Sequence, residues 1–304
     1  MAAFKGQVEV MRILHAKGAN IFCRNQNGSN ALHIATKKGL FQVVRELLKI
    51  KFPLDKLKAN GISALAIAAI KGNLPIIKLL VQAGADVNQL GKNGVAPLYM
   101  AMKAQNLECM QYLLEQNANV YINDPIWNEM SPVFYAIRLN NPTVLSVVLD
   151  SQQCKYLSHM KTAKGFTPIQ YAQSLGQDEM VRLLSLRQQT ELNHADPEGF
   201  TPFSKYALGQ KFEMAIRLLH KGADIDFTNP LGKTALVQAV ESENLPAAKF
   251  LIEKGANPHI EDVKGKDACD YAKAASDYLA FRTLLPACQP EKREKSLQYK
   301  VKSD

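Results

Sequence analysis

Histidine and acidic side chains are the groups in this 304-residue sequence that could do acid–base chemistry. Asp86, Asp224 and Asp226 lie at expected turns, where a short acidic side chain bonds its own backbone. No Gly-rich phosphate loop, HExxH or GxSxG segment occurs. The sequence therefore predicts a protein that is not an enzyme and has no cofactor and no small-molecule substrate. The histidines are scattered: His15, His33, His159, His194, His220 and His259.

The cysteines indicate neither a zinc site nor a disulfide framework, because they are odd in number and lack a CxxC motif or nearby histidine pairs. We expect free thiols in a reducing compartment. Cys109 and Cys269 fall within apolar helical runs and are expected in the core. The five are Cys23, Cys109, Cys154, Cys269 and Cys288.

Lysines near the N-terminus recur at a fixed spacing, which is a pattern for binding. Lys5, Lys38 and Lys71 are each 33 residues apart. Residues 1–100 hold 14 lysines and arginines against 4 acidic residues, whereas the remaining 204 residues hold 23 against 24. Such a row favours an acidic partner, although lysine is also common on solvated surfaces. Further basic candidates are Lys37 and Lys103, one position earlier in the same period, and Lys92 on an expected hairpin tip.

Two aromatic residues form a second candidate binding patch. Trp127, the only tryptophan, and Tyr121 lie in an extended connection. Aromatic residues often dominate binding energy at interfaces. Alternatively, Trp127 folds back and fills a gap between irregular repeats, and this is the interpretation we favour.

The elements that would position these side chains are copies of one unit, typified by residues 60–88. Ser63 can cap a helix, and an apolar run from Ala64 to Ala69 follows it. Gly72 interrupts the run before a second apolar segment, and Gly84 can end that second helix. The unit is thus a pair of short antiparallel helices, which cannot bury its apolar faces without similar neighbours.

Copies of the unit recur through nearly the whole chain. Steps between the glycines that follow the turn are 33 or 34 residues, except around a copy with Glu129 at this position, where they are 35 and 36. A truncated copy at residues 2–20 precedes the others. The glycines are Gly28, Gly61, Gly94, Gly165, Gly199, Gly232 and Gly265.

Short strings within these copies resemble ankyrin repeats, whose signature is T-P-L-H-x-A. They are Thr167-Pro168-Ile169, Thr201-Pro202-Phe203, Ala31-Leu32-His33-Ile34-Ala35 and Gly84-Ala85-Asp86-Val87-Asn88. The resemblance implies an all-α solenoid of helix–turn–helix repeats with β-hairpin-like loops, about eight full repeats and one partial N-terminal repeat. It also implies that the lysine row lies at the ends of the first helices on the concave, partner-binding face. In that register His33 serves a helix–turn hydrogen bond.

The expected domain covers residues 1–288, with a partial repeat at 1–24 and a capping repeat at 262–288. Longer connections are expected around 121–131 and 150–166, on loops that often bind partners. A charged tail, 289–304, is predicted to be disordered. In the seventh copy, Lys205-Tyr206 replaces small residues, which puts a tight helix contact there in doubt.

The N-terminus lacks a secretory signal, and no apolar run approaches the ~18 residues that cross a bilayer. These features predict a soluble cytoplasmic protein without membrane insertion. Met1 falls inside a repeat, and Val8, Val10, Ile13 and Leu14 give that end an apolar character. The chain is therefore expected to be a fragment, or another chain covers this end.

We predict a scaffold that holds a protein partner along its concave face, with the basic first third meeting an acidic segment. An alternative is a regulatory module or subunit of a larger protein or assembly, such as a channel, an enzyme or a cytoskeletal complex. Nucleic-acid binding is disfavoured, because the basic region lacks interleaved aromatic residues.

Overall fold

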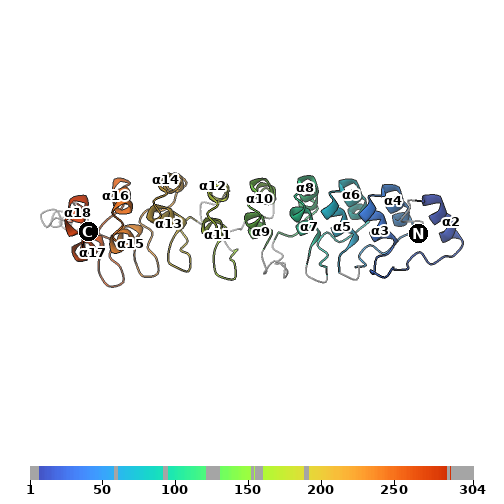
Figure 1. The fold of residues 1–304 in the computed structure, drawn as a ribbon, viewed down its shortest axis with the longest axis horizontal. Coiled ribbons are helices and arrows are strands. Elements are labelled where there is room, and N and C mark those ends of the chain that lie inside the picture. Colours follow the sequence, from blue (N-terminus) through green and yellow to red (C-terminus); the bar gives the residue numbers. More distant parts are fainter. Residues whose placement is uncertain are drawn as a thin grey trace, which may run out of the picture. The chain divides into compact units, whose positions relative to one another are not determined.

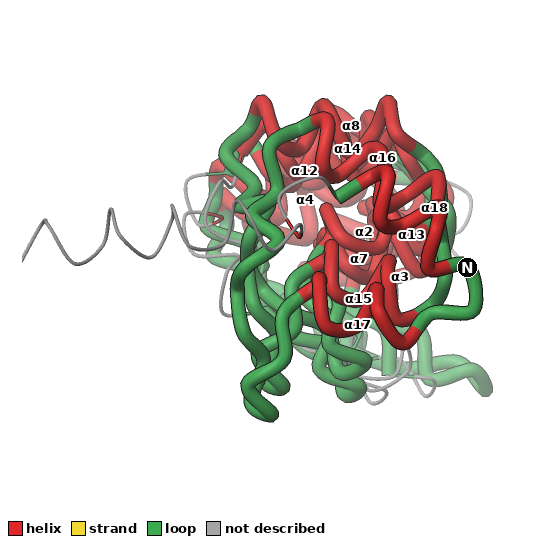
Figure 2. The backbone as a smooth tube through the Cα atoms, turned by 90° about the vertical axis from the view of Figure 1, so that its left-hand side faces the viewer, coloured by secondary structure: helices red, strands yellow, loops and turns green. Residues whose placement is uncertain are grey.

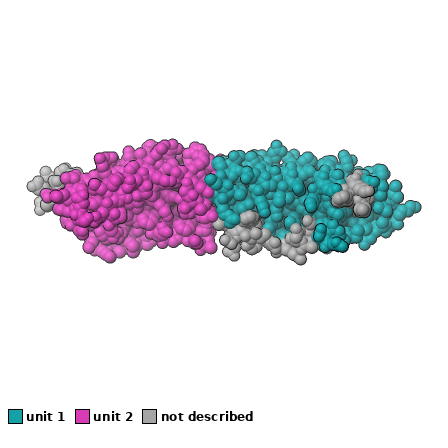
Figure 3. Space-filling model, in the orientation of Figure 1, with its two compact units in different colours: residues 1–156 teal, residues 157–304 magenta. Residues whose placement is uncertain are grey.

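The computed structural model describes residues 7–57, 61–91, 95–120, 131–151, 154, 160–187, 192–285 and 288. The chain divides into two compact units, residues 1–156 and 157–304 (Figure 3). The described residues form helices and connecting loops and contain no strand (Figure 2). The predicted all-α class is therefore confirmed for this part of the chain.

The first unit holds one single helix and four helical pairs (Figure 1). Within the unit, the first helices of the pairs form one row and the second helices another, with the long connections on the side of the first helices. The single helix is α2 (Val8–Ala16), and the pairs are α3 (Ala31–Lys38) with α4 (Phe41–Lys49), α5 (Ala64–Lys71) with α6 (Leu74–Gln82), α7 (Pro97–Lys103) with α8 (Leu107–Glu115), and α9 (Pro132–Arg138) with α10 (Pro142–Leu149).

The second unit holds four more pairs of the same kind. Together with α2, the eight pairs fit the predicted eight full repeats and one partial repeat. The pairs are α11 (Pro168–Ser174) with α12 (Asp178–Arg187), α13 (Pro202–Leu208) with α14 (Phe212–His220), α15 (Ala235–Glu241) with α16 (Leu245–Glu253), and α17 (Ala268–Ala274) with α18 (Tyr278–Leu284).

Polar side chains fix where the first helices begin. In six of the eight pairs, the residue before the first helix accepts a hydrogen bond from the backbone N–H three residues later, which satisfies one of the helix's unpaired donors. Ala96 has no side chain that could do so, and Ser131 makes no such bond to α9. The six capping residues are Asn30, Ser63, Thr167, Thr201, Thr234 and Asp267.

Left-handed backbone residues fix where the helices end. Gly39 and Gly72 follow α3 and α5 with φ of 71° and 68°. Asn117 follows α8 with φ of 62°, as predicted for a residue that tolerates this region. Gly39 and Gly72 turn the chain sharply, so that α4 and α6 run back along α3 and α5.

Small apolar residues let the first helices pack closely. Every residue of α5 from Ala64 to Ala69 is buried, because α5 contacts α3 on one side and α7 on the other. The second helix α6 instead buries one stripe, made of Ile76, Ile77 and Leu80. The core of each unit is therefore shared between neighbouring pairs, as in other repeat folds.

Short polar side chains link successive repeats at four of the turns that follow second helices. A side-chain oxygen in one repeat accepts from the backbone N–H about 31 residues later, at distances of 2.7–3.3 Å. Asp86 and Asp224 also accept from their own backbones two residues on, as predicted. The acceptor–donor pairs are Asp55–Asp86, Asn88–Asn119, Asn193–Asp224 and Asp226–Asn257.

In the seventh copy, α13 lies less closely against α11 and α15 than α5 does against α3 and α7, so the doubt about a tight helix contact there was justified. Tyr206 is buried and donates a 2.8 Å hydrogen bond to Oδ1 of Asp178 at the start of α12. Burial, together with this hydrogen bond, raises the pKa of Tyr206. Residues 121–130, 152–153 and 155–159 of the two longer connections, and the tail at 289–304, lie outside the described residues, and their predicted properties stay predictions.

The hairpin before α17 is closed by one carboxylate. Oδ1 of Asp262 accepts from the backbone N–H groups of Lys264 and Lys266, and Oδ2 accepts from the Tyr271 hydroxyl at 2.6 Å. The Tyr271 hydrogen bond is the main reason that the pKa of Asp262 is lowered. The ionised form of Asp262 is therefore the one that holds the last repeat's hairpin against its first helix.

We expect Thr234→Ala to lower the free energy of unfolding by about 1 kcal/mol, because Oγ1 of Thr234 accepts from the Val237 N–H at the start of α15. Urea denaturation followed by circular dichroism measures the change. Thr234→Ser keeps the hydroxyl and is the matched control. A serine variant as unstable as the alanine variant would contradict a capping role.

We expect Tyr271→Phe to raise the pKa of Asp262 and to destabilise the chain in a pH-dependent way. A lowered folded-state pKa contributes stability above the unfolded value of about 3.9, and this stability is lost as the pH falls through the folded-state pKa. The stability difference between wild type and variant should thus be largest near neutral pH and shrink in acid. Carboxyl NMR titration and urea unfolding at several pH values measure both effects. Tyr278→Phe, at an exposed tyrosine of α18, should show neither.

Candidate functional site

Exposed basic side chains lie at the ends of the first helices in the first unit. Lys37 and Lys38 end α3, Lys71 ends α5 and Lys103 ends α7. All four side chains are exposed, and α5 contacts both α3 and α7. The structure thus places these predicted residues at the C-terminal ends of the first helices of three adjacent repeats. The other predicted residues, Lys5, Lys92, Tyr121 and Trp127, lie outside the described residues.

A fifth basic residue extends this row and was missed from the sequence. Arg138 ends α9, is exposed, and occupies the same helical position as Lys37 and Lys103, seven residues after the capping position. Counting from the capping residue rather than from the lysines would have found it. We call Lys37, Lys38, Lys71, Lys103 and Arg138 the basic row.

The basic row is confined to the first unit. At the positions equivalent to Lys37 and Lys103, the helices α11, α13, α15 and α17 carry no basic residue. Those positions hold Ser174, Leu208, Glu241 and Ala274. A cation at a helix C-terminus is stabilised by the helix dipole by about 0.3–1 kcal/mol. Since α11 and α15 have no basic residue in their last turn, helix stability alone does not require one at this position.

A groove in the second unit is lined by both acidic and basic side chains, which form ion pairs with one another. It has a volume of about 640 Å³ and is lined by Phe200, Leu231 and polar residues of α13 and α15. Lys205 pairs with Asp196 at 3.0 Å, and Lys233 pairs with Glu241 at 2.6 Å. Burial opposes the charge of Lys205, but its bonds to the two carboxylates of Asp196 and Glu198 outweigh that effect and raise its pKa.

The histidine of the T-P-L-H-like string has the structural role that the sequence predicted. His33 is buried in α3, where its backbone N–H donates to the Asn30 side chain at 3.0 Å and its Nδ1 accepts from the Asn30 backbone at 3.4 Å. These two bonds form a reciprocal cap. His33 therefore fixes the start of a helix.

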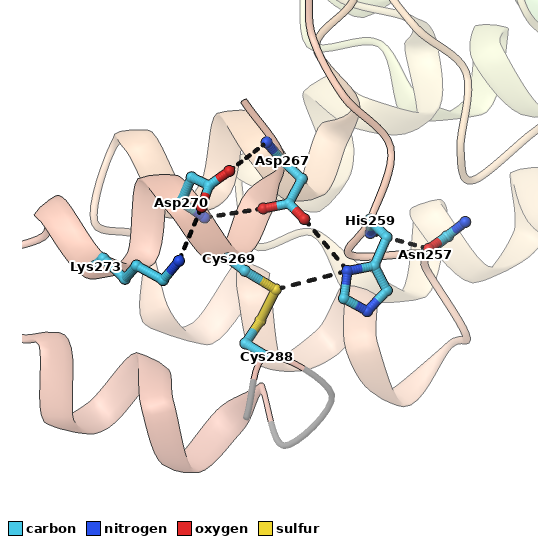
Figure 4. The surroundings of a disulfide bond; sticks show 7 residues. All are labelled: Asn257, His259, Asp267, Cys269, Asp270, Lys273 and Cys288. Atoms are coloured by element: carbon cyan, nitrogen blue, oxygen red, sulfur yellow. Dashed lines mark hydrogen bonds and ion pairs between the residues drawn. A yellow bond between two sulfur atoms is a disulfide. The ribbon is translucent and has the colours of Figure 1, made fainter. Parts of the chain in front are cut away.

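The prediction that all five cysteines are free thiols was wrong. Cys269 in α17 and Cys288, beyond α18, form a disulfide with a Cα–Cα distance of 5.4 Å (Figure 4). Because α17 and α18 pack against each other, Cys288 after α18 comes close to Cys269 in α17. The spacing of the cysteines in the sequence does not indicate this pairing. Cys109 and Cys269 are buried, as predicted. Cys23, Cys109 and Cys154 are free.

One imidazole, one carboxylate and one sulfur converge beside this disulfide (Figure 4). Nδ1 of His259 lies 3.3 Å from Oδ2 of Asp267 and 3.9 Å from Sγ of Cys269. In a catalytic triad, one ring nitrogen of the histidine faces the carboxylate and the other faces the nucleophile. Here the same nitrogen faces both groups and the sulfur is in a disulfide, so the arrangement does not suit nucleophilic catalysis.

The helix α2 exposes apolar side chains. Val10, Ile13 and Leu14 are 41%, 59% and 44% exposed, and no residue of α2 is buried. Arg12 attaches α2 to α4 through an ion pair with Glu46 at 2.9 Å.

Among the helices that the structure describes, none has the length and apolar character required to cross a bilayer.

Comparison with known proteins identifies related sequences. The chain is 31% identical to a putative ankyrin repeat-containing protein of Treponema pallidum over 137 residues, which is 45% of each chain. It is 38% identical to ankyrin repeat protein nuc-2 of Neurospora crassa over 104 residues, 34% of this chain and 9% of that protein. The matched parts thus cover less than half of these relatives.

The family model for ankyrin repeats in three copies matches six overlapping stretches, which together extend over residues 1–294. The stretches are 1–90, 53–124, 83–159, 134–229, 169–262 and 204–294. The matched stretches cover the helical pairs of the structure, α3 with α4 through α17 with α18. The chain therefore belongs to the ankyrin-repeat family.

Proposed function

We propose that this chain is a non-enzymatic scaffold whose basic row binds an acidic segment of a protein partner. Ankyrin repeats generally mediate protein–protein interaction, and the family is typically non-enzymatic. The observation that carries the proposal is that four successive first helices, α3, α5, α7 and α9, end in exposed basic residues. By the family resemblance, this end of the first helix belongs to the concave face.

The spacing of the basic row suits an extended peptide. Packed helices lie about 8–10 Å apart, and an extended chain advances about 3.3 Å per residue. Acidic side chains at every third residue would therefore meet successive repeats. At physiological salt the screening length is about 8 Å, so each acidic group would interact chiefly with the nearest basic residue. Recognition would then depend on register as well as on total charge.

A second candidate function is a regulatory module or subunit of a larger protein or assembly, in the cytoplasm or a cytoskeletal complex. The exposed apolar face of α2 favours it, because Val10, Ile13 and Leu14 would be buried against another chain or a preceding repeat. The two functions are compatible, since they use different surfaces. The first proposal uses the ends of the first helices, whereas the alternative requires that another segment cover α2.

We expect the double variant Lys38→Glu, Lys71→Glu to bind a synthetic peptide with glutamate at every third residue more weakly than wild type. Two exposed charges at about 0.2–1 kcal/mol each predict a loss of about 0.4–2 kcal/mol. The dependence of affinity on salt should also become flatter. Fluorescence anisotropy at several salt concentrations measures both quantities.

The matched control is the double variant Lys249→Glu, Lys254→Glu, at two exposed lysines in and directly after α16 of the second unit. It changes net charge without touching the basic row, and we expect its affinity to stay close to that of wild type. Equal weakening by the control and by Lys38→Glu, Lys71→Glu would mean that only net charge matters. Unchanged affinity in Lys38→Glu, Lys71→Glu would rule out binding through the basic row.

Trp127→Ala separates the two interpretations of the aromatic residues in the long connection. We expect a clear loss in the free energy of unfolding with unchanged peptide affinity, because a tryptophan that fills a gap contributes about 3–5 kcal/mol through packing. Urea denaturation and anisotropy on the same variant measure this. A variant of unchanged stability and reduced affinity would instead assign Trp127, with Tyr121, to partner binding.

A further inference from the structure

We propose that the reduced form of the last repeat binds one Zn²⁺ ion through His259, Asp267, Cys269 and Cys288, and that formation of the disulfide releases it. In the part of the chain that the structure describes, His259, Asp267 and Cys269 are the one group of three potential ligands whose donor atoms all lie within 4.8 Å of one another. Cys288 is joined to Cys269 and supplies a fourth donor (Figure 4).

The distances between these donor atoms suit a tetrahedral zinc site. Zinc binds nitrogen and oxygen at about 2.0–2.2 Å and sulfur at about 2.3 Å. A tetrahedron with those bonds separates nitrogen from oxygen by about 3.4 Å and nitrogen from sulfur by about 3.6 Å. The corresponding distances from His259 Nδ1 are 3.3 Å to Asp267 and 3.9 Å to Cys269. Small side-chain shifts would complete the site.

The carboxylate of Asp267 is already held in place for this role. Its Oδ1 accepts from the Asp270 N–H at 2.9 Å as the cap of α17, while its Oδ2 faces His259. The side chain is 3% exposed. Fixing a ligand through a hydrogen bond on its other atom is typical of metal sites. A cation would also neutralise negative charge in a buried place, where it is costly.

The two sulfurs remain close to these ligands when the disulfide is reduced. Cys269 belongs to α17, and Cys288 follows α18, which packs against α17. A Cα–Cα distance of 5.4 Å keeps both thiols within reach of one ion. The ring of His259 is 31% exposed, which provides a path for the metal from solvent. Two thiolates, an imidazole and a carboxylate form a donor set that zinc prefers.

The zinc-bound reduced form and the disulfide form differ by two electrons and one Zn²⁺ ion. When a small-molecule disulfide oxidises the site, the two zinc-bound thiolates form the Cys269–Cys288 bond. The two electrons they lose cleave the S–S bond of the oxidant, which takes up two protons and leaves as two thiols while Zn²⁺ is released. A dithiol reductant reverses the reaction by thiol–disulfide exchange, and zinc then displaces the thiol protons as it binds.

Co²⁺ is the spectroscopic probe for the test, with the full-length chain kept free of oxygen. We expect the reduced chain to bind one Co²⁺ with the intense visible bands of tetrahedral coordination and near-ultraviolet thiolate-to-metal charge transfer. Zn²⁺ should displace it, and the disulfide form should show neither feature. Treating the zinc-loaded chain with oxidised glutathione should release one Zn²⁺ for every two thiols lost, measured with a zinc-sensitive dye and a thiol reagent.

Two variants test the ligands separately. His259→Asn introduces the residue that the second full repeat has at this position, Asn88, and Cys288→Ser changes a residue outside the helices. Even the loss of a residue that only orients a ligand typically weakens metal binding at least tenfold, so we expect each variant to weaken Co²⁺ binding by about tenfold or more. Cys23→Ser, at an exposed free thiol, is the control and should bind as wild type does.

Several results would overturn the proposal. One is a reduced chain that binds Co²⁺ no more tightly than the disulfide form. Others are a spectrum without thiolate charge transfer, or equal binding by wild type and both ligand variants. Circular dichroism of each variant checks that it is folded. If Cys288→Ser did not fold, His259→Asn alone would still decide the question.

Discussion

The packing of short first helices against one another is the constraint on which the rest of this structure depends. A helix of seven or eight residues is marginal alone, and α5 is stable here because α3 and α7 bury it from both sides. That burial requires alanine-rich faces and exact starting points, hence the capping residues. The last residues of α3 and α5, where Lys38 and Lys71 lie, stay exposed.

Repetition made most of the fold predictable from the sequence. The eight helical pairs and most capping residues followed from spacing, and the role of His33 followed from the resemblance to ankyrin repeats, because each rests on contacts within one unit or between neighbours. The doubt about a tight helix contact at Lys205-Tyr206 agrees with the looser packing of α13, whereas the hydrogen bond from Tyr206 to Asp178 was not predicted. Arg138 was overlooked because the longer connection before α9 shifts its number out of the 33-residue period, although its place in the helix is unchanged.

The C-terminal cluster could not be predicted in the same way. Its donors come from the hairpin, the capping position, α17 and the segment after α18, and they meet only once the last pair has folded. His259 occupies the position where a short polar side chain elsewhere accepts the next repeat's N–H, as Asp226 does. Before the last pair, this position holds the larger imidazole of His259. The sequence alone did not indicate that His259 would contact Asp267 and Cys269.

The bonds that join successive turns have a consequence for how such a chain can change. Each link, such as Asn88 with Asn119 or Asp226 with Asn257, pairs a side-chain oxygen of one repeat with the backbone amide of the following one. Because the donor is backbone, almost any residue can occupy the receiving place. Where such a link exists, a whole repeat can therefore be deleted, duplicated or exchanged during evolution while the junction keeps its hydrogen bond, and a recognition surface can lengthen by recombination.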